Sequence, residues 1–467
     1  MDFTMVEFWC AMSPVILFQY LIWHYIRNKV IKIAFIKWSM LILSFTLLGL
    51  VSAETLIIFA TVTLTAYFVC KTGQNKGNST KKLLLCILIP LLLLPLLYYK
   101  YANFITKEIL QQEWNTFRDL VIPIGISFYT FQTVSFCLDT LRRNQKVPAF
   151  IDYMNFCSFF PQIVAGPIER RDSLLPQMEN LGMRLNSATM QEGIPYVILG
   201  IFFKVALADN LAAGMCVGYE GMNAFQIWAN NICFGFRIYF DFAGYGLSAY
   251  GIAKCLGIKI TQNFLSPYTC CNVTDFWRNW HISLTQWFRD YIYFAIGGSR
   301  TRFWSFNIIF MFLVSGIWHG AGWNFIIWGI LCGGTMVIHR YCRQFNLPHL
   351  PGWVSWSITF VVMMFIWMFF YETDMGLISK NLKAIFNIQN YDAAEFIQIL
   401  KDCPRMGTML ICFSFIATAV ILLEYISGKK YQHPYRIFLT PRACMLMILA
   451  ICVLHPQQPS VFIYFAF

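Results

Sequence analysis

Two histidines, His281 and His319, lie in an apolar, aromatic-rich stretch of the sequence that runs from residue 276 to residue 328. Arg278, Arg289 and Asp290 lie beside or between them. An imidazole titrates near neutral pH, so it suits general-base or nucleophilic chemistry. Inside a membrane an ionisable side chain is costly unless it is paired or solvated, and it is therefore a functional candidate. The pattern predicts a polar site within hydrophobic surroundings.

Each histidine also has a plainer explanation. His319 could be a structural residue, hydrogen-bonded to a backbone carbonyl at a helix junction. His281 lies near basic residues and tryptophans, a combination that is also typical of the membrane–water interface. Metal binding by the pair would need further ligands, and the sequence has no HxxxH motif or Cys/His cluster to supply them. We therefore expect no metal site.

The composition of the 467 residues, 58% hydrophobic and 12% charged, is that of an integral membrane protein. Apolar runs such as residues 83–99 do not alternate with polar residues as barrel strands do, so we expect an all-α protein in a lipid bilayer. The formal charge of +12 comes from basic residues in short loops between apolar segments, as the positive-inside rule predicts. We therefore expect no nucleic acid partner.

We predict eleven or twelve transmembrane helices and two irregular segments, residues 147–186 and 257–298. Interrupted backbone at membrane depth is tolerated only against protein or a water-filled cavity, so we interpret both segments as re-entrant or interfacial. Basic residues in alternate loops predict an N-terminus outside and a location in the cytoplasmic membrane. The predicted apolar segments are residues 8–26, 33–50, 53–70, 83–103, 119–141, 190–208, 224–252, 304–318, 322–339, 352–371, 407–427 and 441–457.

Further polar residues lie in apolar segments or at their ends. We expect Asp139 and Lys204 each to be paired with a partner, as buried charges usually are. Asp241 and Tyr245 lie beside glycines that would allow helices to approach closely, which is a structural role. Asn263 lies in the sequence QNFLSPY, which is typical of a turn that ends a span.

Several sequence blocks follow one another in a fixed order. They are IPIGISFYTFQ (122–132), FFPQIVAGPIERR (159–171), YFDFAGYG (239–246), NFLSPY (263–268), FWRNWHISLTQWFRDYIY followed by IGG, SGIWHGAGWNFIIWG (315–329) and a terminal FIYFAF. This series resembles the membrane-bound O-acyltransferases, in the branch that includes the alginate O-acetyltransferase membrane subunit. The resemblance covers about two thirds of the chain in recognisable blocks, and the first hundred residues match in hydropathy alone.

The resemblance implies roles for particular residues. His319 would be the essential histidine and His281 the second histidine of the same site. The candidates for contact with substrate or acyl donor are Arg278, Trp280, Arg289, Asp290, Trp318 and Asn263. The chain departs from the family pattern at Asn279 and Tyr371, where relatives often have arginine.

The resemblance also implies an architecture, a ring of helices around a thin central partition that is reached by a funnel and a tunnel. We expect a single polytopic membrane domain. It would consist of variable N-terminal spans at residues 1–118, a catalytic core at 119–371, and an external loop with C-terminal spans at 372–467.

The implied activity is transfer of an acetyl group from a cytoplasmic thioester, acetyl-coenzyme A, across the membrane. The acetyl group would serve the O-acetylation of a cell-envelope or secreted polysaccharide, an alginate-like polymer or peptidoglycan. The expected partner is an extracytoplasmic serine-hydrolase-like acetyltransferase, and no bound cofactor is expected.

Two alternatives stay open at this point. Teichoic acid D-alanylation, with a carrier-protein thioester as donor, occurs in the same family. A transporter or polysaccharide exporter with a gating histidine is an alternative of another class. Transporters often show internal repeats and matched broken helices, and no convincing repeat is visible in this sequence.

Overall fold

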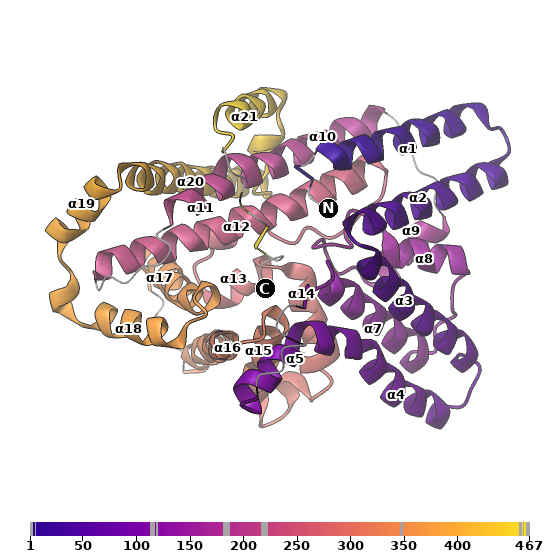
Figure 1. The fold of residues 1–467 in the computed structure, drawn as a ribbon, viewed down its shortest axis with the longest axis horizontal. Coiled ribbons are helices and arrows are strands. Elements are labelled where there is room, and N and C mark those ends of the chain that lie inside the picture. The colour runs from indigo at the N-terminus through magenta and orange to yellow at the C-terminus, as the bar shows by residue number, and fades with distance from the viewer. Residues whose placement is uncertain are drawn as a thin grey trace. The chain divides into compact units, whose positions relative to one another are not determined.

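A computed structural model describes residues 3–4, 6–112, 117, 120–180, 187–215, 223–345, 348, 350–456, 460 and 462–463. These residues form helices joined by turns and irregular segments, with no β-strand among them (Figure 1). The all-α prediction is therefore confirmed. The chain divides into two compact units, Met1–Val197 with Ser248–Thr261, and Ile198–Leu247 with Gln262–Phe467. The single polytopic domain and the ring with a central partition remain predictions.

The first unit is built mainly of long helices, and the two short helices α8 (Phe150–Ser158) and α9 (Arg171–Glu179) pack against them. Its other elements are α1 (Val6–Tyr25), α2 (Lys29–Val51), α3 (Ala53–Gly73), α4 (Asn78–Leu96), α5 (Ala102–Phe104), α7 (Ile126–Arg142), most of α10 (Ser187–Ile201) and the end of α12 (Ala224–Cys255). In this unit α3 packs against α2, α4 and α7, and α8 packs against α2 and α9.

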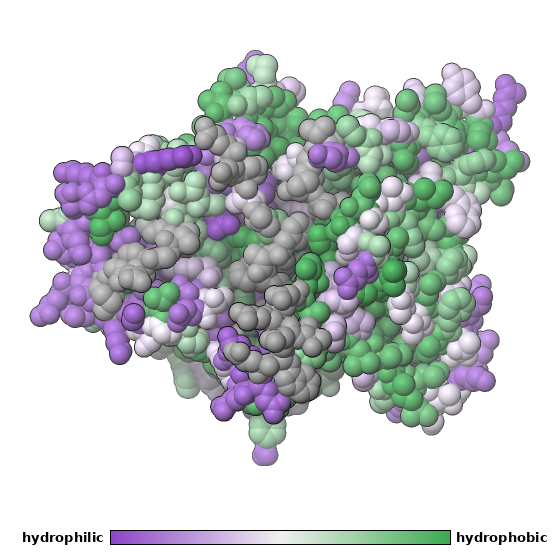
Figure 2. Space-filling view, in the orientation of Figure 1, coloured by the Kyte–Doolittle hydropathy of each residue, from purple (hydrophilic) through white to green (hydrophobic). Residues whose placement is uncertain are grey.

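The sequence of α3 shows why this unit suits a bilayer. Phe59, Ala66 and Cys70 repeat at helical spacing and are fully buried. Ile57 and Phe68 lie elsewhere on the helix and are exposed. A helix that is apolar on its outer side as well as its inner side is typical of a membrane span. Figure 2 shows hydrophobic residues over α1 to α4, with hydrophilic residues at the turns between these helices.

The segment 147–186 contains two short helices, α8 and α9, of nine residues each. At 1.5 Å per residue, each extends about 14 Å, which is half of a bilayer core. Side chains satisfy the last turn of α8: Gln132 and Gln162 both donate to the carbonyl of Phe156 at 2.9 Å. The absence of a spanning helix in the described part of this segment agrees with the prediction.

The second unit holds most of α12, the preceding helix α11 and all of the elements after residue 262. They are α11 (Asp209–Gly214), α13 (Val273–Asn279), α14 (Ile282–Phe288), α15 (Trp304–His319), α16 (Trp323–Gln344), α17 (Gly352–Tyr371), α18 (Met375–Phe386), α19 (Ala393–Asp402), α20 (Pro404–Tyr431) and α21 (Pro441–Val453). Because α13 and α14 have seven residues each, the region 257–298 also lacks a helix long enough to span.

Helices α15 and α16 form a hairpin whose backbones approach closely. A Cβ atom on Gly316 would lie 2.2 Å from the carbonyl oxygen of Phe325, and one on Gly329 would lie 2.5 Å from that of Phe312. Larger residues would separate the helices, so glycine is required at both positions. The hairpin fixes the turn at which α15 ends.

Seven helices in the described part of the chain are long and apolar enough to cross a membrane, and three apolar helices are shorter. The chain is therefore a multi-pass membrane protein. The number is lower than the eleven or twelve spans predicted from the sequence. Several of the predicted segments form helices that are too short or too polar to be counted as spans. For example, α15 has 16 residues and extends about 24 Å, less than the bilayer core of about 30 Å. The seven are Lys29–Val51, Ala53–Gly73, Asn78–Ile109, Ser187–Gly214, Trp323–Gln344, Gly352–Tyr371 and Pro404–Tyr431.

Candidate active site

His319 is the last residue of α15, and Gly320 is its C-cap. The imidazole lies among aromatic rings at centroid distances of 4.9 Å for Trp318, 5.1 Å for Trp328 and 5.2 Å for Phe370. Its side chain is buried, with 7% of the residue exposed. A helix end that points an imidazole into an aromatic pocket excludes most water from it, which strengthens any electrostatic interaction there.

His281 is the N-cap of α14, and its backbone is left-handed, with φ of +42°. This conformation is strained for a residue with a side chain, and such strain clusters at functional sites. The residue is 2% exposed, and its ring lies 4.7 Å from that of Phe242 and 6.2 Å from that of Trp318. Burial lowers the pKa of His281 to about 3. The imidazole is therefore neutral at physiological pH.

Asn263 fixes the turn that contains His281. Its backbone carbonyl accepts a hydrogen bond from the N–H of Ile282 at 2.9 Å, and its side-chain oxygen accepts one from the N–H of Ser283 at 3.1 Å. Asn263 is 2% exposed. These two bonds satisfy the first N–H groups of α14 and hold the chain on either side of the strained residue.

His281 and His319 line the same cavity, whose volume of about 20 Å³ is enough for about one water molecule. The cavity lies between α13, α14 and α15, so a single space connects an irregular segment with the C-terminal end of α15. Its other lining residues are Trp277, Trp280, Leu284, Thr285, Phe288, Met311, Phe312 and Ser315.

The structure brings three of the six sequence-predicted contact residues to the histidine pair. Trp280 lines the cavity, Trp318 contacts both imidazoles, and Asn263 holds the turn of His281. Three others lie elsewhere. Arg289 and Asp290 form a salt bridge with each other at 2.8 Å, and Arg278 pairs with Asp275 at 3.1 Å on an exposed surface. None of these three lines the histidine cavity, and their roles toward the donor remain predictions.

A buried carboxyl group, that of Glu424 on α20, was not among the residues predicted from the sequence. It is 1% exposed and accepts hydrogen bonds from Tyr239 at 2.8 Å and Ser266 at 2.6 Å. Tyr435 donates to the carbonyl of Phe264 at 2.9 Å in the same cluster. The cluster therefore anchors residues 263–268 of the segment between α12 and α13. A lone glutamate in an apolar helix was the available signal.

Lys204 is paired, as predicted. Its amine lies 2.8 Å from a carboxylate oxygen of Asp209 and 2.8 Å from one of Asp241, and all three side chains are buried. Asp241 also accepts a hydrogen bond from the N–H of Ile463 at 2.7 Å. The neighbouring Phe462 packs on Phe242 with a centroid distance of 5.9 Å. The network thus holds residues 462–463 against Phe242, whose ring contacts His281.

Other expectations for polar residues have mixed outcomes. Asp139 is paired with Arg143 at 3.4 Å, as expected. Asn279 donates to the carbonyl of Asp275 at 2.9 Å, and Tyr371 donates to Asn231 at 3.1 Å, so both departures from the family pattern have structural contacts. Residues 464–467 of the terminal FIYFAF motif lie outside the described residues. Within the described residues, no group of three or more His, Cys, Asp or Glu side chains could hold a metal ion.

Residues 77–378 match the MBOAT, membrane-bound O-acyltransferase, family. The chain belongs to this family. It is an acyltransferase, and family membership favours the enzymatic interpretation over the transporter alternative.

Named relatives of this acyltransferase narrow the class of reaction. The chain is 31% identical to the peptidoglycan O-acetyltransferase of Helicobacter pylori over 86% of each chain. It is 30% identical to the probable alginate O-acetylase AlgI of Pseudomonas aeruginosa, over 81% of this chain and 75% of the relative. It is also 26% identical to the teichoic acid D-alanyltransferase of Bacillus subtilis, over 66% of this chain and 79% of the relative.

Proposed function

We propose that this MBOAT protein takes an acetyl group from acetyl-coenzyme A at the cytoplasmic face for O-acetylation of a cell-envelope polysaccharide, an alginate-like polymer or peptidoglycan. The observation that carries the proposal is the cavity shared by His281 and His319 in a chain of the acyltransferase family. The two histidines are far apart in the sequence, and the fold brings them to one site. Relatives named as peptidoglycan and alginate acetylating proteins support the acetyl group and the polymer acceptors.

In the proposed reaction His319 acts as a general base. It takes the proton of the acceptor hydroxyl while the hydroxyl oxygen attacks the thioester carbonyl carbon. The new C–O bond forms, the C–S bond breaks, and the proton passes from His319 to the departing thiolate. A route in which the imidazole of His319 briefly carries the acetyl group uses the same residue as a nucleophile.

His281 serves the same reaction as a neutral hydrogen-bonding group. A neutral imidazole has one N–H donor and one acceptor nitrogen. Because burial lowers its pKa to about 3, His281 does not compete with His319 for the proton. We propose that its N–H orients the acceptor or stabilises the charge that develops on the carbonyl oxygen. Such a donor in a water-excluded site is worth a large part of the rate.

We propose that the inner membrane holds the chain with its N-terminus outside. An extracytoplasmic serine-hydrolase-like acetyltransferase would receive the acetyl group and modify the polymer. The donor is made inside the cell and the polymer lies outside it, so a site reached from both faces would move the acetyl group without moving coenzyme A.

The test follows labelled acetyl from acetyl-coenzyme A into the envelope polymer of cells that carry the wild type or His319→Ala. We expect loss of transfer in His319→Ala at an unchanged amount of folded protein. His24→Ala, at an exposed position on α1, is the matched control and should retain full transfer. Undiminished transfer by His319→Ala would overturn the proposal. Incorporation of labelled D-alanine instead of acetyl would assign the chain to the D-alanylating branch.

A further inference from the structure

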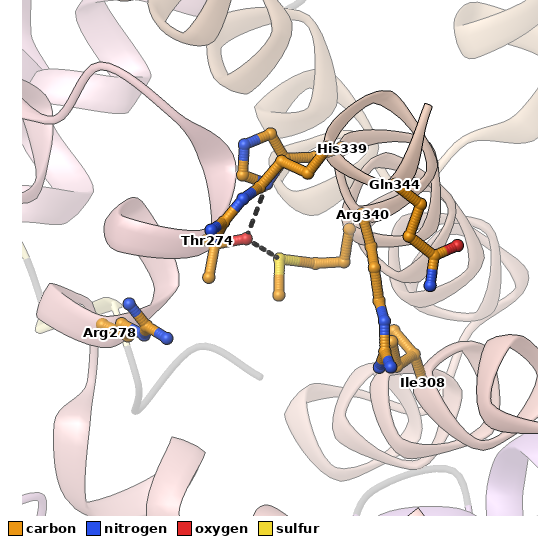
Figure 3. Close-up of a pocket in the computed structure, with 8 residues that line it drawn as sticks. Thr274, Arg278, Ile308, His339, Arg340 and Gln344 are labelled. Carbon is orange, nitrogen blue, oxygen red and sulfur yellow. Dashed lines mark hydrogen bonds between the residues drawn. The ribbon is translucent and has the colours of Figure 1, made fainter. Parts of the chain in front are cut away.

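A second pocket lies beside the histidine cavity, in the same unit of the chain. It has a volume of about 450 Å³, within the range of small-molecule sites. Thr274 and Arg278 contribute to it from α13, Ile308 from α15, and the C-terminal part of α16 supplies the rest. Figure 3 shows the hydroxyl of Thr274 directed at the imidazole of His339 and Arg340 extended toward Ile308. The lining from α16 consists of Met336, His339, Arg340, Arg343 and Gln344.

The pocket is strongly basic. Three arginines and a histidine line it, and none of its eight described lining residues is acidic. One carboxylate lies nearby, that of Asp275, and its pair with Arg278 is exposed on both sides. Exposed pairs contribute little and exchange readily with a competing anion. Among the described residues, the pocket therefore gathers more positive charge than the single exposed Asp275 pair offsets.

The donors are also arranged for an anion. The guanidinium of Arg340 lies 4.1 Å from the ring of Trp304, and this contact holds its planar group in place. Among the described residues, the guanidinium of Arg343, which lines the pocket, has no hydrogen-bond or ion-pair partner. The hydroxyl of Thr274 and a nitrogen of His339 are 2.8 Å apart. Guanidinium groups match phosphate oxygens with two parallel hydrogen bonds, and hydroxyl and amide groups can add single ones.

We propose that this pocket binds a phosphate group. A positive-inside signal alone would place arginines in the loop after α16. It would not bring them together with a threonine and an arginine from α13 around one pocket. The convergence of two helices is the observation that points to a ligand, and phosphate is the common biological anion that three guanidinium groups suit.

The position of the pocket suggests the source of the phosphate. Arg278 of the basic pocket and Trp277 of the histidine cavity are adjacent on α13, and Ile308 and His319 lie on the same helix, α15. His319 is eleven positions after Ile308 on α15, which corresponds to about 16 Å along the helix. An acyl donor has its phosphate groups and its thioester at opposite ends of a flexible arm. This step rests on the proposed function: the phosphate belongs to the acyl donor. The basic pocket binds the phosphate while the thioester of the same donor reaches His319.

The experiment measures binding directly, in full-length protein reconstituted in nanodiscs of zwitterionic lipid. The probe is adenosine 3′,5′-bisphosphate, the phosphate-bearing end of coenzyme A, with adenosine as the uncharged control. We expect the bisphosphate to bind and adenosine not to bind. Arg343→Ala and Arg278→Ala should each weaken binding about tenfold, because each removes a charge-assisted hydrogen bond. Arg302→Ala, at an exposed arginine outside the pocket, should leave the affinity unchanged.

A second arm uses nanodiscs that contain phosphatidylglycerol. If a lipid headgroup is the ligand, the bisphosphate does not bind and phosphatidylglycerol is retained by the wild type but lost from Arg343→Ala. This result supports a phosphate site and overturns the donor assignment. Absence of both ligands from the wild type, or equal binding in the wild type and both arginine variants, overturns the proposal. His319→Ala should bind the bisphosphate normally, so failure of the pocket and failure of the proposed catalysis are separable.

Discussion

The side chain of Asn263 accepts a hydrogen bond from the N–H of Ser283 at 3.1 Å, two residues after His281. Together with the backbone bond from Ile282, it encloses a histidine whose φ is +42°. A left-handed histidine would relax if the chain around it were free, because this conformation is unfavourable for a residue with a Cβ atom. Asn263 therefore acts on the site through the backbone of its neighbour.

Replacing Asn263 with alanine should lower acetyl transfer about tenfold or more, with a smaller effect on folding. The change leaves the buried N–H of Ser283 without its acceptor, a loss of about 1–3 kcal/mol, and lets the His281 turn relax. Asn263→Asp keeps the acceptor oxygen and should recover part of the activity. Transfer assays and thermal unfolding of the purified protein would measure both. Acetyl transfer by Asn263→Ala at the wild-type rate would show that the hydrogen bond from Ser283 to the Asn263 side chain has no functional role.

His281 should make the stability depend on pH in a defined direction. Burial lowers its folded pKa to about 3 from the usual 6.5, so the unfolded chain binds a proton there more readily. Its contribution is complete above about pH 6.5 and is lost as the pH falls toward 3. The melting temperature of the wild type should therefore fall more steeply between pH 7 and pH 4 than that of His281→Asn. Parallel curves for the two proteins would contradict this assignment.

The positive φ at position 281 predicts a difference between two inactive variants. Asparagine tolerates the left-handed conformation, whereas a β-branched side chain does not. His281→Asn and His281→Val should both lose acetyl transfer, but His281→Val should also be less stable by about 1–2 kcal/mol. Thermal unfolding at neutral pH distinguishes them. Equal melting temperatures would mean that the backbone changes conformation without penalty.

Glu424 should matter for stability more than its distance in sequence from the histidines suggests. Glu424→Ala leaves the hydroxyl groups of Tyr239 and Ser266 buried without their acceptor, which costs about 1–3 kcal/mol for each group. Glu424→Gln retains one acceptor oxygen and should be milder. Leu422→Ala, at an exposed position of the same helix, is the control for a truncated side chain. A Glu424→Ala protein as stable as the control would remove Glu424 from the scaffold of the site.

Replacement of Lys204 should be tolerated only when Asp209 and Asp241 are replaced by neutral residues at the same time. Lys204→Met leaves two buried carboxylates, Asp209 and Asp241, without their cation, and breaking such a network costs about 3–5 kcal/mol. The triple variant Lys204→Met, Asp209→Asn, Asp241→Asn should recover most of the stability, since no unpaired charge remains. Thermal unfolding and yield of folded protein provide the readout. If the single and triple variants were equally unstable, the network would serve packing and not charge balance.

Part of the site was visible in the sequence because the signal was local. An ionisable residue in an apolar run stands out without any knowledge of the fold, and this identified His281, His319 and Lys204. The same rule applies to Glu424, which the sequence analysis passed over. The motif order predicted the family, and the composition predicted a helical membrane protein, because the fraction of apolar residues alone excludes a soluble chain.

The tertiary structure decided which of these residues meet. The histidine cavity needs α13, α14 and α15 to pack together, and the basic pocket needs the end of α16 to face α13. Arg278 illustrates the limit: the sequence placed it beside His281, yet its side chain lines the other pocket. Adjacent residues on a helix point about 100° apart, so proximity in sequence does not assign a side chain to a cavity. That assignment depends on helix packing, which arises from contacts between residues far apart in the chain.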